Sequence, residues 1–399
     1  MKMRNCFALV LLMSVSAVWV SPAQAIPAFA RKYETPCTTC HTAWPKLNSF
    51  GRQFKENGYK FARGEQGKTQ VISDFLEWDK NVPVTGIFVA RPYDKKKSGD
   101  VKLRALHEIE ILIAGVIYKD VSGYFELEAE DETGFEIELP HHAVSYHPFS
   151  FANVMFAYAA NHWSDPYDTY ADHRRMTRGH ATIGDQAFGG ADNGGKERNS
   201  HQQFSINGRP IKPLFYNVGV TGVAKDPEGE DPHTYFGRLT FDIMPDIMVG
   251  GMHTQGKCTT TGATGATGDG GSGNCLVNRN FTRTGVDVQA DFLGARLSGV
   301  AMKATDDDAT ATNEVENTAA YVEGMYVFKN GGRPWIVPLV RADQYTKNDG
   351  KDDYASLTAN VTYYYSENVK AYLEYWNETK RADNKDKDSR ITLQILAAF

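Results

Sequence analysis

Apolar and polar residues alternate along many segments of the chain after residue 84. In the segment 286–292, valine, alanine and phenylalanine alternate with aspartate and glutamine. Similar alternation recurs at 109–113, 125–130, 357–363 and 391–399. A period of two residues is that of β-strands with one apolar and one polar face. The sequence therefore predicts an all-β protein.

The spacing of these segments indicates how the strands are connected. We expect sixteen strands, at 84–91, 101–116, 122–132, 137–147, 150–160, 201–207, 212–224, 234–243, 247–254, 281–291, 295–304, 317–328, 334–345, 354–364, 369–377 and 389–399. Links after even-numbered strands are short, such as 244–246, whereas those after odd-numbered strands are usually longer, such as 161–200. Short periplasmic turns that alternate with long outer loops are typical of outer-membrane barrels. A soluble sandwich shares the alternation within strands but has no reason to sort its loops in this way. The predicted fold is an antiparallel, porin-like β-barrel over 81–399, with outer-membrane lipid around it.

Both ends of the chain agree with export to the outer membrane. Lys2 and Arg4 precede a mostly apolar run at 7–20 and a small-residue cleavage site at 23–25, so the first 25 residues are predicted to be a Sec signal peptide. The final predicted strand ends at Phe399. This ending resembles that of bacterial outer-membrane barrels, in which it serves as an assembly signal.

The alternation also assigns charged side chains to the inner wall, because a basic residue facing lipid near the midplane costs about 2–4 kcal/mol. The residues assigned inward are Arg104, Glu108, Glu110, Glu126, Glu128, Glu130, Asp287, Asp291 and Glu374. A formal net charge of −6 argues against nucleic acid as a partner. Acidic walls favour cations, although a solvated pore wall explains most of these residues equally well.

A short motif near the start of the chain points to a covalent cofactor. Cys37, Cys40 and His41 form a C-x-x-C-H pattern, in which the two thiols can bind haem vinyl groups as thioethers and the histidine can ligate the iron. A thioredoxin-type dithiol would need a βαβ context, and a zinc site would need a second ligand pair. We therefore expect one haem c, with His41 as an axial ligand of its iron.

Two further cysteines bracket a low-complexity segment. Cys258 and Cys275 lie on either side of residues 259–273, which are mostly Thr, Gly and Ala. We expect a disulfide that closes this outer loop. Neither cysteine has a partner at C-x-x-C spacing, so a second haem is not indicated, and a metal pair lacks other ligands nearby.

The segment 26–80 differs from the barrel and is predicted to form a haem-bearing plug inside it. Its basic residues are Lys46, Arg52, Lys55, Lys60, Arg63 and Lys68. A barrel of sixteen strands is wide enough to hold such a segment. Between residues 26 and 73 there is no methionine and no histidine besides His41. The sixth iron position is therefore open, weakly occupied, or filled by the barrel.

The alternation of inward and outward positions along each strand limits which barrel residues could be the sixth iron ligand. Adjacent His141 and His142 must face opposite ways, so at least one of them should face the lumen, and this pair is the preferred donor. Met155 and Met252 are the next candidates. His107 shares its parity with the isoleucines at 109–113 and is predicted to face lipid or an interface.

The link 161–200 is expected to be a long outer loop that carries His162, His173 and His180. Carboxylates on the outer loops could help to dock iron ions, since they are hard oxygen ligands. The candidates are Asp165, Asp168, Asp172, Asp306, Asp307 and Asp308. Simple solvation of these charges is an alternative explanation.

The segments 26–33, 37–41, 45–52 and 57–59 together resemble the fused monohaem cytochrome–porins of iron-oxidising bacteria. The resemblance is strong over residues 26–61 and only architectural over the barrel. It implies an outer-membrane iron(II) oxidase, in which extracellular Fe(II) gives an electron to the haem and a periplasmic c-type cytochrome, or a similar acceptor, removes it. It assigns roles only to Cys37, Cys40 and His41.

Two other functions stay open at this point. The first is a diffusion porin in which the haem is structural or sensory. The second is a peroxidase-like enzyme, which would need a distal histidine or arginine beside an open iron.

Overall fold

The computed structural model describes residues 28–62, 69–73, 76–79, 84–188, 195–222, 224–225, 233–258, 279–308, 310–381 and 386–399. The predicted signal peptide lies outside these residues, and so does Cys275. The predicted disulfide with Cys258 therefore remains a prediction.

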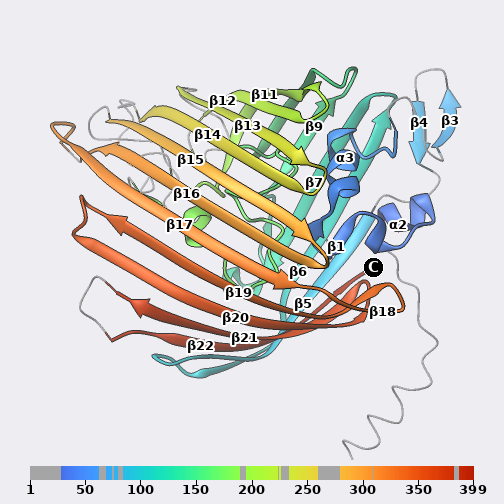
Figure 1. Ribbon diagram of the computed structural model, residues 1–399. Coiled ribbons are helices and arrows are strands. Elements are labelled where there is room, and N and C mark those ends of the chain that lie inside the picture. Colours follow the sequence, from blue (N-terminus) through green and yellow to red (C-terminus); the bar gives the residue numbers. More distant parts are fainter. Residues whose placement is uncertain are drawn as a thin grey trace, which may run out of the picture.

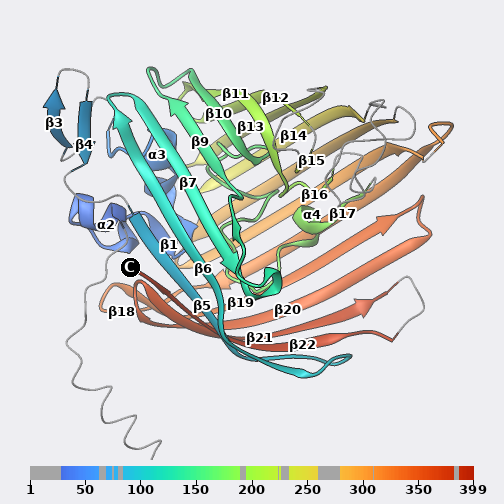
Figure 2. The same cartoon turned by 180° about the vertical axis from the view of Figure 1, so that it is seen from behind.

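Most of the described chain forms one closed antiparallel barrel (Figures 1 and 2). Its strands are β5 (Val84–Lys96), β6 (Val101–Tyr118), β7 (Val121–Glu130), β8 (Ile137–Glu138), β9 (His142–Tyr146), β10 (Asn153–Ala160), β11 (Ser200–Ile211), β12 (Leu214–Thr221), β13 (Thr234–Met244), β14 (Ile247–Cys258), β15 (Arg279–Phe292), β16 (Ala295–Asp307), β17 (Glu314–Tyr326), β18 (Phe328–Asn330), β19 (Arg333–Lys347), β20 (Asp352–Ser366), β21 (Val369–Lys380) and β22 (Ser389–Ala398). β8 and β9 both pair with β7, and β17 and β18 both pair with β19, so the described strands occupy sixteen positions. The predicted barrel of sixteen strands is confirmed.

The barrel closes where the last strand meets the first. β22 pairs with β5, and the backbones of Phe399 and Gly86 exchange two hydrogen bonds of 3.0 Å. The Phe399 ring stacks on Phe88 at 5.6 Å. A Cβ at residue 86 would lie 2.7 Å from the end of the Phe399 ring, so glycine lets the ring lie this close to the strand.

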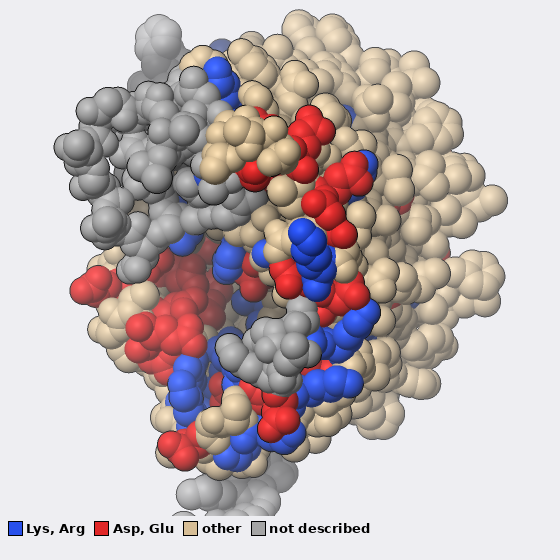
Figure 3. Space-filling model, turned by 90° about the vertical axis from the view of Figure 1, so that its left-hand side faces the viewer, with Lys and Arg blue, Asp and Glu red and all other residues tan. Residues whose placement is uncertain are grey.

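The expected sorting of faces is present in the long strands. In β15, for example, Val286 is 63% exposed whereas the neighbouring Asp287 is 6% exposed. Apolar side chains thus face outward, where lipid would surround them, and polar ones face inward. Viewed from the end with the long links, acidic and basic side chains gather at the barrel mouth while other residues cover the outer wall (Figure 3).

The prediction for His107 is wrong, because β6 contains an irregularity. Val89 pairs with Glu108 but Arg91 pairs with Arg104, so β6 advances four residues while β5 advances two. Within this irregular stretch the neighbouring residues His107 and Glu108 are both buried, so strict alternation fails here. His107 is buried, and its Nδ1 lies 2.8 Å from Asp131 Oδ1.

The link between β10 and β11 is not an outer loop as expected, since its described part folds into the barrel. Arg238 on β13 is fully buried and contacts Asp165 of this link and Asp287 of β15, each at 2.8 Å. The Tyr321 hydroxyl donates to Thr169 O at 2.9 Å. Near its end, the link contains the short helix α4 (Thr182–Asp185). We refer to the described part of this link, residues 161–188 and 195–199, as the inner loop.

The N-terminal elements lie at the end of the barrel that carries the short turns (Figure 1). They are α2 (Ala28–Tyr33), the 3₁₀ turn η1 (Cys37–Thr39), β1 (His41–Ala43), β2 (Lys46–Leu47) and α3 (Ser49–Glu56). A separate hairpin follows, formed by β3 (Thr69–Ser73) and β4 (Leu76–Asp79). No helix in the described part of the chain is long and apolar enough to cross a bilayer.

Candidate cofactor site

The C-x-x-C-H motif is organised by one asparagine. Cys37 opens η1, and the amide of Cys40 donates to Cys37 O at 3.1 Å. Asn48 caps α3 by accepting from Gly51 N at 2.9 Å, and its Nδ2 donates to the carbonyls of Thr38 and Thr39. A capping side chain that also binds the preceding turn fixes the motif relative to the helix.

The helix α3 lies directly against the motif. A Cβ at Gly51 would lie 2.0 Å from the carbonyl oxygen of Cys40, which is far inside van der Waals contact. The residue at this position must be glycine for the helix to approach so closely. Cys40 O also accepts from Asn48 N at 2.9 Å, so the turn and the helix form one unit.

The ring of His41 is oriented by a backbone carbonyl. Its Nδ1 lies 3.1 Å from the carbonyl oxygen of Pro45, which favours the tautomer with a proton on Nδ1 and a lone pair on Nε2. Burial lowers the pKa of His41 to about 4, so the ring is neutral at pH 7. Metal-bound histidines commonly donate their second N–H to a backbone carbonyl in this way.

The motif is attached to the barrel at the turn between β20 and β21. Glu367 in this turn accepts from Cys37 N at 2.9 Å and from the Thr38 hydroxyl at 3.2 Å. The Trp44 carbonyl accepts from Tyr364 at 2.7 Å and from Lys370 Nζ at 3.1 Å. Because short turns of outer-membrane barrels face the periplasm, the motif lies at the periplasmic mouth.

Ion pairs connect the rest of the segment 28–62 to the barrel and the inner loop. They are Lys46 with Asp172 at 3.4 Å and with Glu323 at 3.3 Å, Arg52 with Asp291 at 3.6 Å, Lys60 with Asp120 at 2.8 Å, and Glu56 with Arg209 at 2.6 Å. In addition, Lys55 Nζ donates to the carbonyls of Trp163 and Asp165. Several of these charges are buried, so removing one partner would be costly.

A cavity of about 860 Å³ opens beside the motif. Cys37, Cys40 and His41 all line it, together with aromatic residues of the segment such as Phe54 and Tyr59. Its volume lies within the range of cofactor pockets, about 300–1,000 Å³. Burial, and then the Glu367 carboxylate, raise the pKa of the Cys37 thiol to about 12, and burial raises that of Cys40 to about 11. Two protonated thiols, which can form thioethers, and a neutral imidazole beside a cavity of this size fit a haem c.

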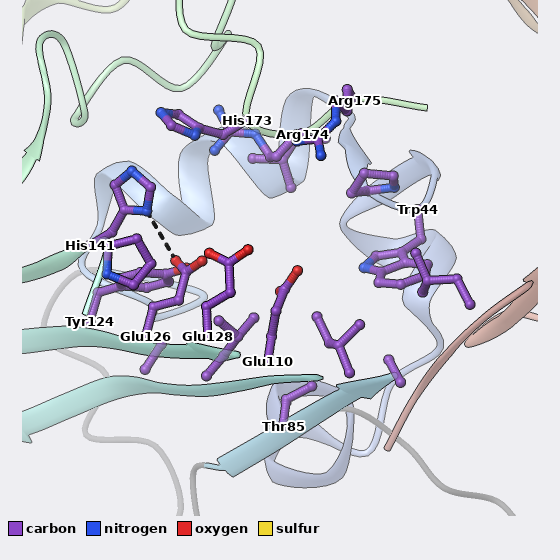
Figure 4. Close-up of a pocket in the computed structure, with 18 of the residues that line it drawn as sticks. Trp44, Thr85, Glu110, Tyr124, Glu126, Glu128, His141, His173, Arg174 and Arg175 are labelled. Carbon is purple, nitrogen blue, oxygen red and sulfur yellow. Dashed lines mark hydrogen bonds and ion pairs between the residues drawn. The ribbon is translucent and has the colours of Figure 1, made fainter. Parts of the chain in front are cut away.

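Carboxylates form one wall of the same cavity (Figure 4). They come from β6 and β7 and from β8, and they are Glu108, Glu110, Glu126, Glu128, Glu130 and Glu138. One carboxylate oxygen from each of Glu108, Glu128 and Glu130 lies within 4.8 Å of the others. The inward assignment of the first five residues is confirmed. The wall offers hard oxygen ligands to a cation.

Histidines and arginines form the facing side of the cavity, where Figure 4 places His173, Arg174 and Arg175 opposite Glu110 and Glu128. These three residues belong to the inner loop, and all three line the cavity. Burial, followed by the nearby His141 and Arg174, lowers the pKa of His173 well below its usual value. The sequence did not predict that these inner-loop residues face the cavity, because the alternation within strands does not indicate the path of a long loop.

Of the expected histidine pair, His141 lines the cavity and His142 does not. His141 lines the cavity, stacks on Trp163 at 4.7 Å and has its Nδ1 3.4 Å from Glu126. His142 does not line it and packs instead beside Tyr158 and Phe125. The expectation that at least one of the two faces the lumen is confirmed.

Three of the proposed iron-docking carboxylates are not on an outer surface. Asp165, Asp172 and Asp306 are each 2–3% exposed and pair with Arg238, Arg341 and Arg283. These acids balance buried cations, so they are not available to ions approaching from outside. That interpretation was wrong for them, because the sequence does not reveal their basic partners.

Comparison with known proteins supports the architecture. No protein-family model matches the sequence, and no curated protein matches it. Solved structures with a similar fold include OmpF of Salmonella typhi, at 15% identity and a TM-score of 0.56, over 80% of this chain and 98% of that one. An anion-selective porin of Comamonas acidovorans has 12% identity and a TM-score of 0.57 over 79% and 98%. OmpT of Vibrio cholerae has 13% identity and a TM-score of 0.55 over 80% and 98%. The chain has the fold of outer-membrane porins, which supports a location in the outer membrane.

Proposed function

We propose that this protein is an outer-membrane cytochrome–porin that takes electrons from extracellular Fe(II) and passes them to a periplasmic c-type cytochrome. One observation carries the proposal: the C-x-x-C-H motif and a wall of carboxylates line the same cavity inside a porin-like barrel. A c-type haem bound there would supply a one-electron redox couple. Cys37 and Cys40 would hold it covalently, and His41 would ligate its iron.

The carboxylates suit the entry of the substrate ion. β7 runs away from the short turn at Lys119–Asp120, so Glu126, Glu128 and Glu130 succeed one another toward the outer mouth. Residues two apart on a strand are separated by about 7 Å. These side chains therefore form a series of carboxyl groups between the outer mouth and the motif, which would offer oxygen ligands to an entering Fe²⁺.

The position of the motif supports an exit of the electron on the periplasmic side. Cys37 and Thr38 donate hydrogen bonds to Glu367, which lies in a short turn at the periplasmic end of the barrel. Fe²⁺ would lose one electron on the outer side and become Fe³⁺, and a periplasmic acceptor would gain that electron.

The diffusion porin with a structural or sensory haem is the second candidate, favoured by the likeness to general porins. Against it, the segment 28–62 and the inner loop both bind the inner wall and each other. Lys46, for example, contacts Asp172 of the inner loop and Glu323 of β17. Such contacts narrow the path for bulk solutes.

Stopped-flow spectroscopy tests the proposal. Mixing the oxidised protein with Fe²⁺ should reduce the haem within seconds, as read from its Soret and α bands. The double variant Glu128→Gln, Glu130→Gln should be reduced at least several-fold more slowly by Fe²⁺, because two carboxyl ligands for the cation are lost. Its reduction by dithionite, an anion, should not be slowed.

The matched control is Glu314→Gln, Glu316→Gln, at the start of β17, where neither carboxylate lines the cavity. This pair should leave the rate with Fe²⁺ nearly unchanged. A haem that Fe²⁺ does not reduce at all would contradict the proposed function, and equal rates in both double variants would remove the role of the carboxylate wall.

A further inference from the structure

The inference concerns the sixth ligand of the haem iron, and it rests on the proposed haem attachment. His41 is the one histidine in the described segment 28–62, which also has no methionine. A second strong ligand must therefore come from another part of the cavity wall. The buried or half-buried nitrogen and sulfur donors that line the cavity are Lys55, His141, His173, Met176, His180 and Lys370, and Lys225, which also lines it, is exposed to solvent.

Three of these donors are engaged elsewhere. Lys55 Nζ donates to the carbonyls of Trp163 and Asp165, and Lys370 Nζ donates to that of Trp44. The thioether of Met176 is 3.6 Å from the Tyr364 hydroxyl, and the residue is 1% exposed. Ligation by any of them would break contacts that hold the segment 28–62 or the inner loop in place.

Two of the histidines are also held by other groups. His180 has its Nδ1 3.1 Å from Asp172 O, and its own carbonyl accepts from Arg341 on β19 at 3.0 Å. This anchors it near the barrel wall. His141 lies flat on Trp163, with an angle of 9° between the rings, and its Nδ1 faces Glu126. Its ring is thus fixed against the carboxylate wall.

Neither ring nitrogen of His173 forms a hydrogen bond within the described residues, and the same holds for His141. The two differ in their charged neighbours: His141 Nδ1 lies 3.4 Å from a Glu126 oxygen, whereas no carboxylate of the described residues pairs with the His173 ring. Its Nε2 is a buried atom without a partner, which is unfavourable unless something else satisfies it. The ring stands edge-on to His141 at 4.6 Å and to Trp163 at 5.3 Å, so two aromatic neighbours support it from the side. An imidazole supported by packing but free of hydrogen bonds can turn toward a metal without losing any.

The backbone around His173 is anchored, and the residue lines the same cavity as the motif. Arg174 N donates to Asp168 Oδ2 at 2.7 Å. The inner loop is tied to α3 through Lys55, which binds the carbonyls of Trp163 and Asp165. Figure 4 shows His173 on the side of the cavity opposite the carboxylates. We propose that His173 of the inner loop is the sixth ligand of the haem iron, giving bis-histidine coordination with His41.

This ligation would also suit electron transfer better than peroxidase chemistry, because a sixth strong ligand leaves no open position on the iron. It would connect the haem to the inner loop, so that the barrel contributes directly to the redox centre.

The test uses the full-length oxidised protein in detergent, with visible and electron paramagnetic resonance spectra as readouts. The unaltered protein should be low-spin. His173→Ala should lose most of the low-spin signal and gain a high-spin one, and added imidazole should restore the low-spin spectrum. His141→Ala and His180→Ala, the matched controls from the same cavity, should stay low-spin.

A high-spin spectrum in the unaltered protein would overturn the proposal, and so would an unchanged low-spin spectrum in His173→Ala. His173→Met, which keeps a donor at the position, should stay largely low-spin and separates ligation from a loss of folding. In-gel haem staining separates a failure of the proposed His173 ligation from a failure of the proposed haem attachment. Stained protein with unchanged spectra would remove only the role of His173, whereas unstained protein would remove the haem attachment itself.

Discussion

At the scale of single residues, the structure explains why the motif can work where it does. Asn48 binds both the turn of the motif and the start of α3, and Gly51 lets the helix approach the Cys40 carbonyl. The Pro45 carbonyl then orients His41. The cysteines and His41 could be recognised from the sequence, but these three supporting residues could not, because their roles depend on close contacts rather than on spacing.

Gly51→Ala tests this local arrangement. The added methyl group would overlap Cys40 O, so α3 must move away from the motif, and we expect a loss of about 1–3 kcal/mol in stability. Haem incorporation per protein, measured by in-gel staining, should fall with it. Gly324→Ala on β17 is the control, because nothing lies within 4 Å of the added Cβ. Equal haem content in the two variants would contradict the close packing of α3 on the motif.

At the scale of elements, the alternation of apolar and polar residues predicted the strands but not the loops or the irregular stretches. The predicted strand 137–147 is interrupted between β8 and β9, and the irregularity in β6 turned His107 away from its expected face. The inner loop was placed outside because its fold depends on Arg238 and Arg341, residues on distant strands. Such pairings over long sequence separations leave no local pattern. For this reason His173 was not recognised as a candidate ligand.

Arg238 should control the position of the inner loop. Arg238→Ala would leave Asp165 and Asp287 buried without their cation, at a cost of about 3–5 kcal/mol. We expect the inner loop to become sensitive to added protease and the folded band in unheated gels to be lost at lower temperature. Lys303→Ala removes an exposed pair with Glu316 and should cost at most about 1 kcal/mol. Equal protease resistance in both variants would show that Arg238 does not hold the loop.

At the scale of the whole molecule, the carboxylates of the barrel wall and the motif meet in one cavity. The carboxylates belong to the wall formed by β6 and β7, and the N-terminal elements lie at the end of the barrel with the short turns (Figure 1). A general porin needs an open lumen between the two ends of its barrel. Here the segment 28–62 and the inner loop contact the inner wall and each other, which narrows the path for solutes.

The most direct test of this account is electron transfer across a vesicle membrane. Vesicles with the protein in their bilayer would enclose oxidised c-type cytochrome, and Fe²⁺ would be added outside. We predict that the enclosed cytochrome becomes reduced within seconds to minutes, while vesicles with the Cys37→Ala, Cys40→Ala variant, which cannot attach haem, show only the slow background. Equally fast reduction in both kinds of vesicle would mean that Fe²⁺ itself crosses an open pore, and it would contradict the proposed role of the haem.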